Sequence, residues 1–105
     1  MSRPKYVTQK DIARWSDIID SDPSIPKEIK AIEDIREVCY CGMWLTEKLL
    51  DLNCPESIAI KVQWTAGKLS YGKDPWKVHA KVLRDYKSNK LIIEKDPSES
   101  TLVLN

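Results

Sequence analysis

The side chains that could take part in catalysis or metal binding are one histidine, three cysteines and a short acidic cluster. His79 stands among lysines, with no carboxylate paired to it nearby in sequence. General acid–base or nucleophilic catalysis would need an acid or nucleophile within hydrogen-bond reach. The chain also has no Gly-rich phosphate loop and no His-Glu-x-x-His or Gly-x-Ser-x-Gly pattern. We therefore interpret His79 as a surface or packing residue, and expect no enzymatic activity, no cofactor and no small-molecule substrate.

The cysteines and carboxylates do not form a recognisable metal or redox motif. Cys39 and Cys41 are two residues apart in a helical pattern, which directs their side chains to nearly opposite sides. Cys54 makes the number odd, and no Cys-x-x-Cys pair occurs. We interpret all three as structural thiols. Three carboxylates on the polar side of the same segment are interpreted as ordinary surface acids, without metal: Glu33, Asp34 and Glu37.

A row of basic side chains is the clearest signal for a charged ligand. Lys77, Lys81 and Arg84 follow one another at spacings of four and three, which places them along one side of a helix. Further lysines lie nearby: Lys73, Lys87 and Lys90. Such a row could neutralise phosphates of a nucleic acid. The other interpretation is a solvated face, because the whole chain has a net charge of only +1.

Four helices are expected from the caps, the prolines and the apolar spacing. Thr8 and Asp11 form a capping-box pattern at the start of the first helix. Prolines at the first helical position begin the second and third helices, Gly72 ends the third, and Asp74 caps the fourth. The expected ranges are about 9–19, 26–53, 55–71 and 75–88.

The second helix is expected to be the unbroken central element. A 4-3-4-3 apolar spacing runs along it on Ala31, Ile35, Val38, Gly42, Leu45, Leu49 and Leu52. Its segment 38–45 has no charged residue, and a helix that is apolar all round must be covered on all sides. The third helix also carries two apolar stripes, one on Ile58, Val62, Ala66 and Leu69 and one on Ile60, Trp64, Gly67 and Tyr71.

The four tryptophans are candidates for the core or for a binding surface. We interpret Trp15 and Trp64 as core residues. Trp44 lies off the main stripe of the second helix, beside Tyr40 and Met43, and is either buried within the chain or part of an interface. Trp76, in the first turn of the fourth helix, is a further interface candidate.

The length of 105 residues and a hydrophobic content of 42% fit one all-α domain. We divide it into an arm (1–7), a helical core (8–89) and a C-terminal extension (90–105), whose apolar runs at 91–93 and 102–104 could form a β-hairpin. The polar first ten residues do not resemble an export signal, and no run approaches the roughly 18 apolar residues of a membrane span. We expect a cytoplasmic protein without a membrane partner.

Two function classes remain. The first is a protein–protein interaction module that self-associates, because the second and third helices carry more apolar surface than so short a chain readily covers. Its expected interface residues are Tyr40, Met43, Trp44, Trp76, Leu102 and Leu104. The second is a nucleic-acid-binding protein, since the order helix, turn, helix and hairpin over 56–104 resembles a winged helix-turn-helix. The resemblance implies that the helix 75–88 contacts nucleic acid through Lys73, Lys77, Lys81, Arg84 and Lys87.

Overall fold

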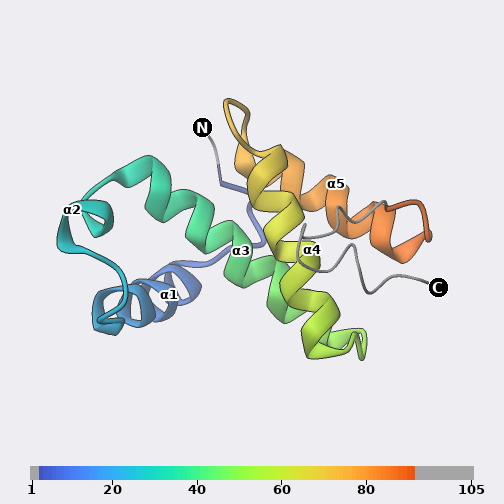
Figure 1. Cartoon of the computed structure of the whole chain (residues 1–105), viewed down its shortest axis with the longest axis horizontal. Helices are drawn as coiled ribbons and strands as arrows, with labels where there is room; N and C mark the ends of the chain where they lie inside the picture. Colours follow the sequence, from blue (N-terminus) through green and yellow to red (C-terminus); the bar gives the residue numbers. More distant parts are fainter. Residues whose placement is uncertain (1–2, 92–105) are drawn as a thin grey trace, which may run out of the picture.

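The structure, a computed structural model, describes residues 3–91, and these residues fold into five α-helices. The all-α class predicted from the sequence is confirmed. The helices are α1 (Gln9–Ser21), α2 (Lys27–Lys30), α3 (Glu33–Asp51), α4 (Glu56–Leu69) and α5 (Pro75–Lys87). In Figure 1, α3 runs through the middle, with α1 and α2 on one side and α4 and α5 on the other; α3 contacts all four. The predicted hairpin, with Leu102 and Leu104, lies outside the described residues.

The prediction of one unbroken helix over 26–53 is wrong. Ile32 has extended backbone angles, with φ −86° and ψ 110°, and separates α2 from α3. The carbonyl oxygen of Lys30 accepts a hydrogen bond from Arg36 Nη1 at 3.2 Å, and the same nitrogen pairs with Asp20 of α1 at 2.8 Å. Helix propensity is a weak preference that tertiary contacts override. We attribute the break to these contacts, because the sequence there contains no proline or glycine.

The prolines and Gly72 do not stand where predicted: Pro26 and Pro55 are the N-cap residues before α2 and α4, and α4 ends at Leu69, three residues before Gly72.

The other predicted caps are confirmed. Thr8 Oγ1 accepts the N–H of Asp11 at 3.2 Å, and the Asp11 carboxylate accepts the N–H of Thr8 at 3.1 Å, which confirms the capping box. Asp74 caps α5 by accepting the N–H of Trp76 at 3.1 Å. Asn53 ends α3 with a φ of 61°, the left-handed conformation that asparagine tolerates after a helix. α4 therefore folds back directly on α3, as the short link predicts.

The core is built from the inward faces of α1, α3, α4 and α5. Its fully buried aliphatic and aromatic side chains include Trp15, Ile19, Leu45, Leu49, Val62, Ala66 and Val82. Of the stripe predicted for the second helix, only the central part lies inside. Ile35 and Leu52, towards its two ends, are exposed. The core thus covers one stripe of α4 and the middle of α3, and leaves apolar side chains outside.

Candidate interaction surface

Three of the aromatic residues predicted to form an interface are buried within the chain, so that assignment is corrected. Tyr40 and Trp44 are buried, and Trp76 is only 2% exposed. Trp44 meets the ring of Trp76 edge-on at 6.3 Å and stacks on Tyr6 of the N-terminal arm at 5.4 Å. Met43 is partly buried against the same core. The rings of Tyr6, Trp44 and Trp76 thus cover one another, although they come from the arm, α3 and α5. Periodicity along a single helix could not predict such a contact between separate segments.

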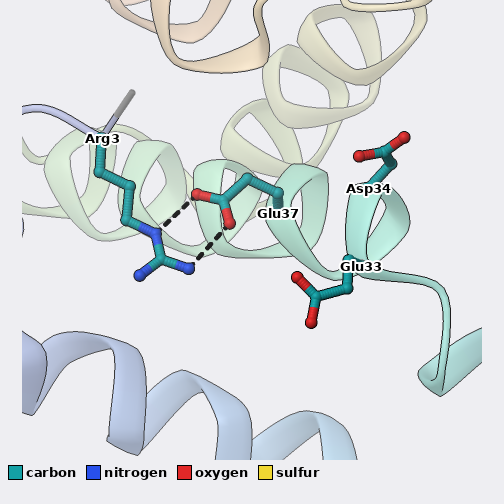
Figure 2. A pocket seen from close by; sticks show the side chains of 4 residues that line it. All are labelled: Arg3, Glu33, Asp34 and Glu37. Atoms are coloured by element: carbon teal, nitrogen blue, oxygen red, sulfur yellow. Dashed lines mark hydrogen bonds and ion pairs between the residues drawn. The ribbon is translucent and has the colours of Figure 1, made fainter. Parts of the chain in front are cut away.

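A carboxylate ties this aromatic cluster together. Glu37 of α3 accepts hydrogen bonds from Trp76 Nε1 at 2.6 Å and from Arg3 Nε and Nη2 at 2.8 and 2.9 Å. Figure 2 shows the paired contact between Arg3 and Glu37, with Glu33 and Asp34 extending from the first turn of α3. The Arg3 guanidinium holds the pKa of the Glu37 carboxyl below its usual range, because it stabilises the charged form. Glu37 is therefore a structural link and not a surface acid.

The pocket beside this link is acidic and has a volume of about 380 Å³, lined by Arg3, Glu33, Asp34 and Glu37. Two of its acids, Glu33 and Asp34, are exposed at the N-terminus of α3, where negative charge is favourable to the helix. Across residues 3–91, no His, Cys, Asp and Glu side chains are grouped in threes as a metal ion would need. We interpret Glu33 and Asp34 as surface acids that stabilise the N-terminus of α3.

The histidine lies inside the core. His79 is fully buried, and its Nδ1 lies 2.7 Å from the carbonyl oxygen of Pro75 and 3.2 Å from Ser70 Oγ. Burial lowers the pKa of His79, because it penalises the charged imidazolium. Since a carbonyl oxygen only accepts, Nδ1 carries the proton, and the buried Nε2 has no hydrogen-bond partner among the described residues. This placement agrees with the packing interpretation and separates His79 from solvent.

The three cysteines are free thiols. Cys41 and Cys54 are buried, and Cys39 is half-buried. Burial raises the pKa of the Cys41 thiol and of the Cys39 thiol, which keeps both in the unreactive protonated form at neutral pH. This environment fits their interpretation as structural thiols.

Exposed apolar side chains occur on several elements of residues 3–91, and those on α4 and the turn after it form a row. Ile60, Trp64, Gly67 and Tyr71, here called the α4 surface, follow at spacings of four, three and four, so they share one side of the helix and the turn after it. Ile60 is 54%, Trp64 44% and Tyr71 92% exposed. The assignment of Trp64 to the core is therefore wrong. The other stripe of α4, with Val62 and Ala66, takes the core position because it faces α3 and α5.

A groove continues the α4 surface towards α3. The groove has a volume of about 510 Å³, and mostly apolar groups from α3, α4 and the turn before α5 line it, among them Ile35, Val38, Cys39, Gly67 and Tyr71. Its charged lining residues are Asp34 and Lys73. The space beside Gly67 is open, because a Cβ atom at this position would meet no atom within 4 Å. We call this feature the α3–α4 groove.

The basic residues predicted for the nucleic-acid alternative are all on the outside. Five of them lie on or just before α5 and are exposed: Lys73, Lys77, Lys81, Arg84 and Lys87. Lys81 Nζ pairs with Asp85 at 2.7 Å, which partly neutralises the middle of the row. Within residues 3–91, no helix combines the length and apolarity needed to cross a membrane.

Comparison of the chain with family models, curated proteins and solved structures gives no match. The sequence signalled the α4 surface as a second apolar stripe, but it did not show which stripe faces the core. The groove was not predicted, because it is formed where Ile35 and Cys39 of α3 meet Gly67 of α4.

Proposed function

We propose that this chain is a non-enzymatic protein–protein interaction module that binds through the α4 surface and the α3–α4 groove. The observation that carries the proposal is the exposure of Ile60, Trp64 and Tyr71 on one side of α4, next to an apolar groove. Single exposed apolar residues are ordinary, but contiguous ones mark interaction sites. Tryptophan and tyrosine are also the residues that most often dominate binding energy at interfaces.

The size and lining of the groove support the same proposal. Its volume of about 510 Å³ is comparable with that of binding clefts, and its lining is mostly apolar. An apolar side chain of a partner would find a floor of Ile35, Val38 and Cys39, with Tyr71 beside it. Lys68 Nζ lies 4.2 Å from the centre of the Trp64 ring, a cation–π contact that places one charged group beside the exposed ring.

A photo-crosslinking experiment tests this function. The photoreactive residue p-benzoylphenylalanine would replace Trp64 or Tyr71 in cells that contain the chain naturally. Position 18 on α1 serves as the control, because Ile18 is similarly exposed at 51% but lies away from the α4 surface. We expect a discrete polypeptide adduct from 64 and 71, absent from 18. Binding should then be reconstituted with the purified adduct partner, and Ile60→Lys should abolish it. No discrete adduct from either position would contradict the proposal.

The exposed row on α5 supports nucleic-acid binding as the second candidate. All five basic side chains of the row face solvent and could reach phosphates. Affinity for duplex DNA should then fall steeply with salt, and neutralising Lys77, Lys81 and Arg84 together should reduce the salt slope by about 3. Titration of a duplex at low salt measures this. Absence of binding at low salt would exclude nucleic-acid binding through this row.

A further inference from the structure

We propose that the C-terminal segment of this chain, residues 92–105, covers the α3–α4 groove of its own molecule, with Leu102 and Leu104 as the side chains that enter it. The segment lies outside the described residues. The support comes from the point at which the described chain stops and from the residue types that follow. Coverage of the groove does not depend on the proposed function, whereas its consequence, competition between the segment and a partner, rests on that function.

The described chain stops beside the groove. Leu91, its last residue, is half-buried, packs against the core and lines a cavity of about 210 Å³ together with Leu69 of α4 and Val82 of α5. Lys73 lines both this cavity and the α3–α4 groove. The segment after Leu91 therefore starts close to the groove, because the two hollows share a side chain.

The segment is long enough to reach the groove. Ten residues, 92–101, lie between Leu91 and Leu102. An extended chain advances by about 3.3 Å per residue, so this link spans up to about 33 Å, far more than the lysine side chain that borders both hollows. Within one molecule, a short flexible link gives an effective concentration on the order of mM, and the entropy cost of closing the loop grows only slowly with its length. A weak contact is therefore enough to keep the groove occupied.

The end of the segment matches the apolar lining of the groove. Residues 102–104 read Leu-Val-Leu, and alternate side chains of an extended peptide point to the same side, so Leu102 and Leu104 can enter together. Ile35 and Val38 of α3 supply much of the apolar lining, and Ile35 is 37% exposed among the described residues. Covering this lining with two leucine side chains removes apolar surface of both from water, which is favourable.

Charge favours the same path. The segment contains one lysine and three carboxylates, which gives its side chains a net charge of −2; the carboxylates are Glu94, Asp96 and Glu99. The basic row of α5 borders the start of the segment, because Lys73 and Lys81 both line the cavity at Leu91. Asp85, in the same lining, pairs with Lys81, whereas Lys73 is the cation shared with the groove. Exposed ion pairs are weak, so we expect the charges to guide the segment and the two leucines to hold it.

Alkylation of Cys39 by N-ethylmaleimide, read by mass spectrometry on the purified full chain, tests the inference. Cys39 lines the groove, whereas Cys41 and Cys54 are buried and report on general unfolding. The double variant Leu102→Asp with Leu104→Asp should release the segment and raise the rate of Cys39 alkylation about threefold or more. The rates at Cys41 and Cys54 should not change.

A matched control keeps the leucines. Ser98→Asp with Ser100→Asp adds the same charge to the same segment and should not raise the rate of Cys39 alkylation. A second measurement places the segment directly: with oxidised glutathione as the oxidant, Leu104→Cys should form a disulfide with Cys39 within one molecule, at a yield that does not depend on protein concentration.

Two outcomes overturn the inference. One is an equal rate of Cys39 alkylation in the original chain and in the leucine double variant. The other is protection of Cys39, or a disulfide from Leu104→Cys, that appears only as the protein concentration rises, because the segment of a second copy would then occupy the groove.

The inference and the proposed function can fail separately. If the segment does not cover the groove, photo-crosslinks from positions 64 and 71 to a partner still support the interaction module. If the segment protects Cys39 but no discrete adduct forms, the inference stands and the proposed function fails. For the competition, the purified adduct partner should bind the leucine double variant about threefold or more tightly than it binds the original chain. Equal affinity for the two chains would overturn the competition.

Discussion

Two aromatic pairs in this chain have similar composition and opposite surroundings. Trp44 and Trp76 meet inside the fold, where Tyr6 and Glu37 close over them. Trp64 and Tyr71 stand on the outside of α4. The first pair is covered because three separate segments, the arm, α3 and α5, converge on it. The number of apolar side chains on a helix therefore does not decide which of them stay exposed to solvent. The segments that pack against the helix decide this.

The largest expected difference between the two pairs is in folding stability. Trp76→Ala should lower the free energy of unfolding by about 3–5 kcal/mol, because it removes a buried ring and leaves a cavity. Trp64→Ala should change the stability of the monomer by less than about 1 kcal/mol. Urea unfolding at low protein concentration measures both. Equal losses in the two variants would show that the contrast between the pairs is wrong.

The link through Glu37 can be broken by acid. Its carboxyl pKa is lowered in the folded chain, mainly by Arg3, so the unfolded chain takes up a proton first as the pH falls. Stability from this link is thus present above the unfolded pKa of about 4.3 and is lost as the pH falls through the folded value. Glu37→Gln should lower the free energy of unfolding by about 1–3 kcal/mol at pH 7, and the variant should lose less stability than the original chain as the pH falls. Unfolding curves between pH 7 and pH 3 measure this. The same loss of stability on acidification in both chains would contradict it.

His79 gives a smaller effect at higher pH. Burial lowers its pKa in the folded chain, so below about pH 6.5 the unfolded chain binds a proton that the folded chain refuses. Stability should therefore fall as the pH drops below 6.5, with a slope of at most about 1.4 kcal/mol per pH unit. His79→Leu should remove this dependence. Thermal unfolding of both chains at pH 8 and pH 5.5 measures it, and an identical decrease in the two would contradict the assignment.

The smallest expected changes in stability come from two helical glycines, Gly67 on the exposed side of α4 and Gly42 where α3 packs against α4. Gly67→Ala should stabilise the monomer by about 0.4–1 kcal/mol, because alanine is the better helix former and the position is open. Gly42→Ala should not give this gain, because its Cβ would come 2.7 Å from Gln63 Nε2 where α3 crosses α4. Thermal unfolding of the two variants side by side measures the difference.

Much of the fold could be predicted from local chemistry. Several helix boundaries are set by contacts between residues close in sequence, and such contacts can be predicted from the residue types. They are the capping box of Thr8 and Asp11, the left-handed Asn53 and the N-cap Asp74. The break at Ile32 could not be predicted, since Arg36 and Asp20 support it from other parts of the chain.

The candidate site shows the same limit. The stripe through Ile60, Trp64, Gly67 and Tyr71 was visible in the sequence, but its exposure was not, because a helix with two apolar stripes offers either one to the core. The sequence predicts Trp44 in an interface and Trp64 in the core, whereas Trp44 is buried and Trp64 is exposed. The decisive contacts are Tyr6 on Trp44 and Glu37 on Trp76, both between segments far apart in the sequence.

Hydroxyl-radical footprinting of the four tryptophans and of Tyr71, read by mass spectrometry, measures which of these rings solvent reaches. In the chain alone we expect strong oxidation of Trp64 and Tyr71 and little oxidation of Trp15, Trp44 and Trp76. Addition of the partner recovered from the photo-crosslink should protect Trp64 and Tyr71 and leave the other three unchanged. Oxidation of Trp64 that is as low as that of Trp44 in the chain alone, or that the partner does not reduce, would contradict the α4 surface as the binding site.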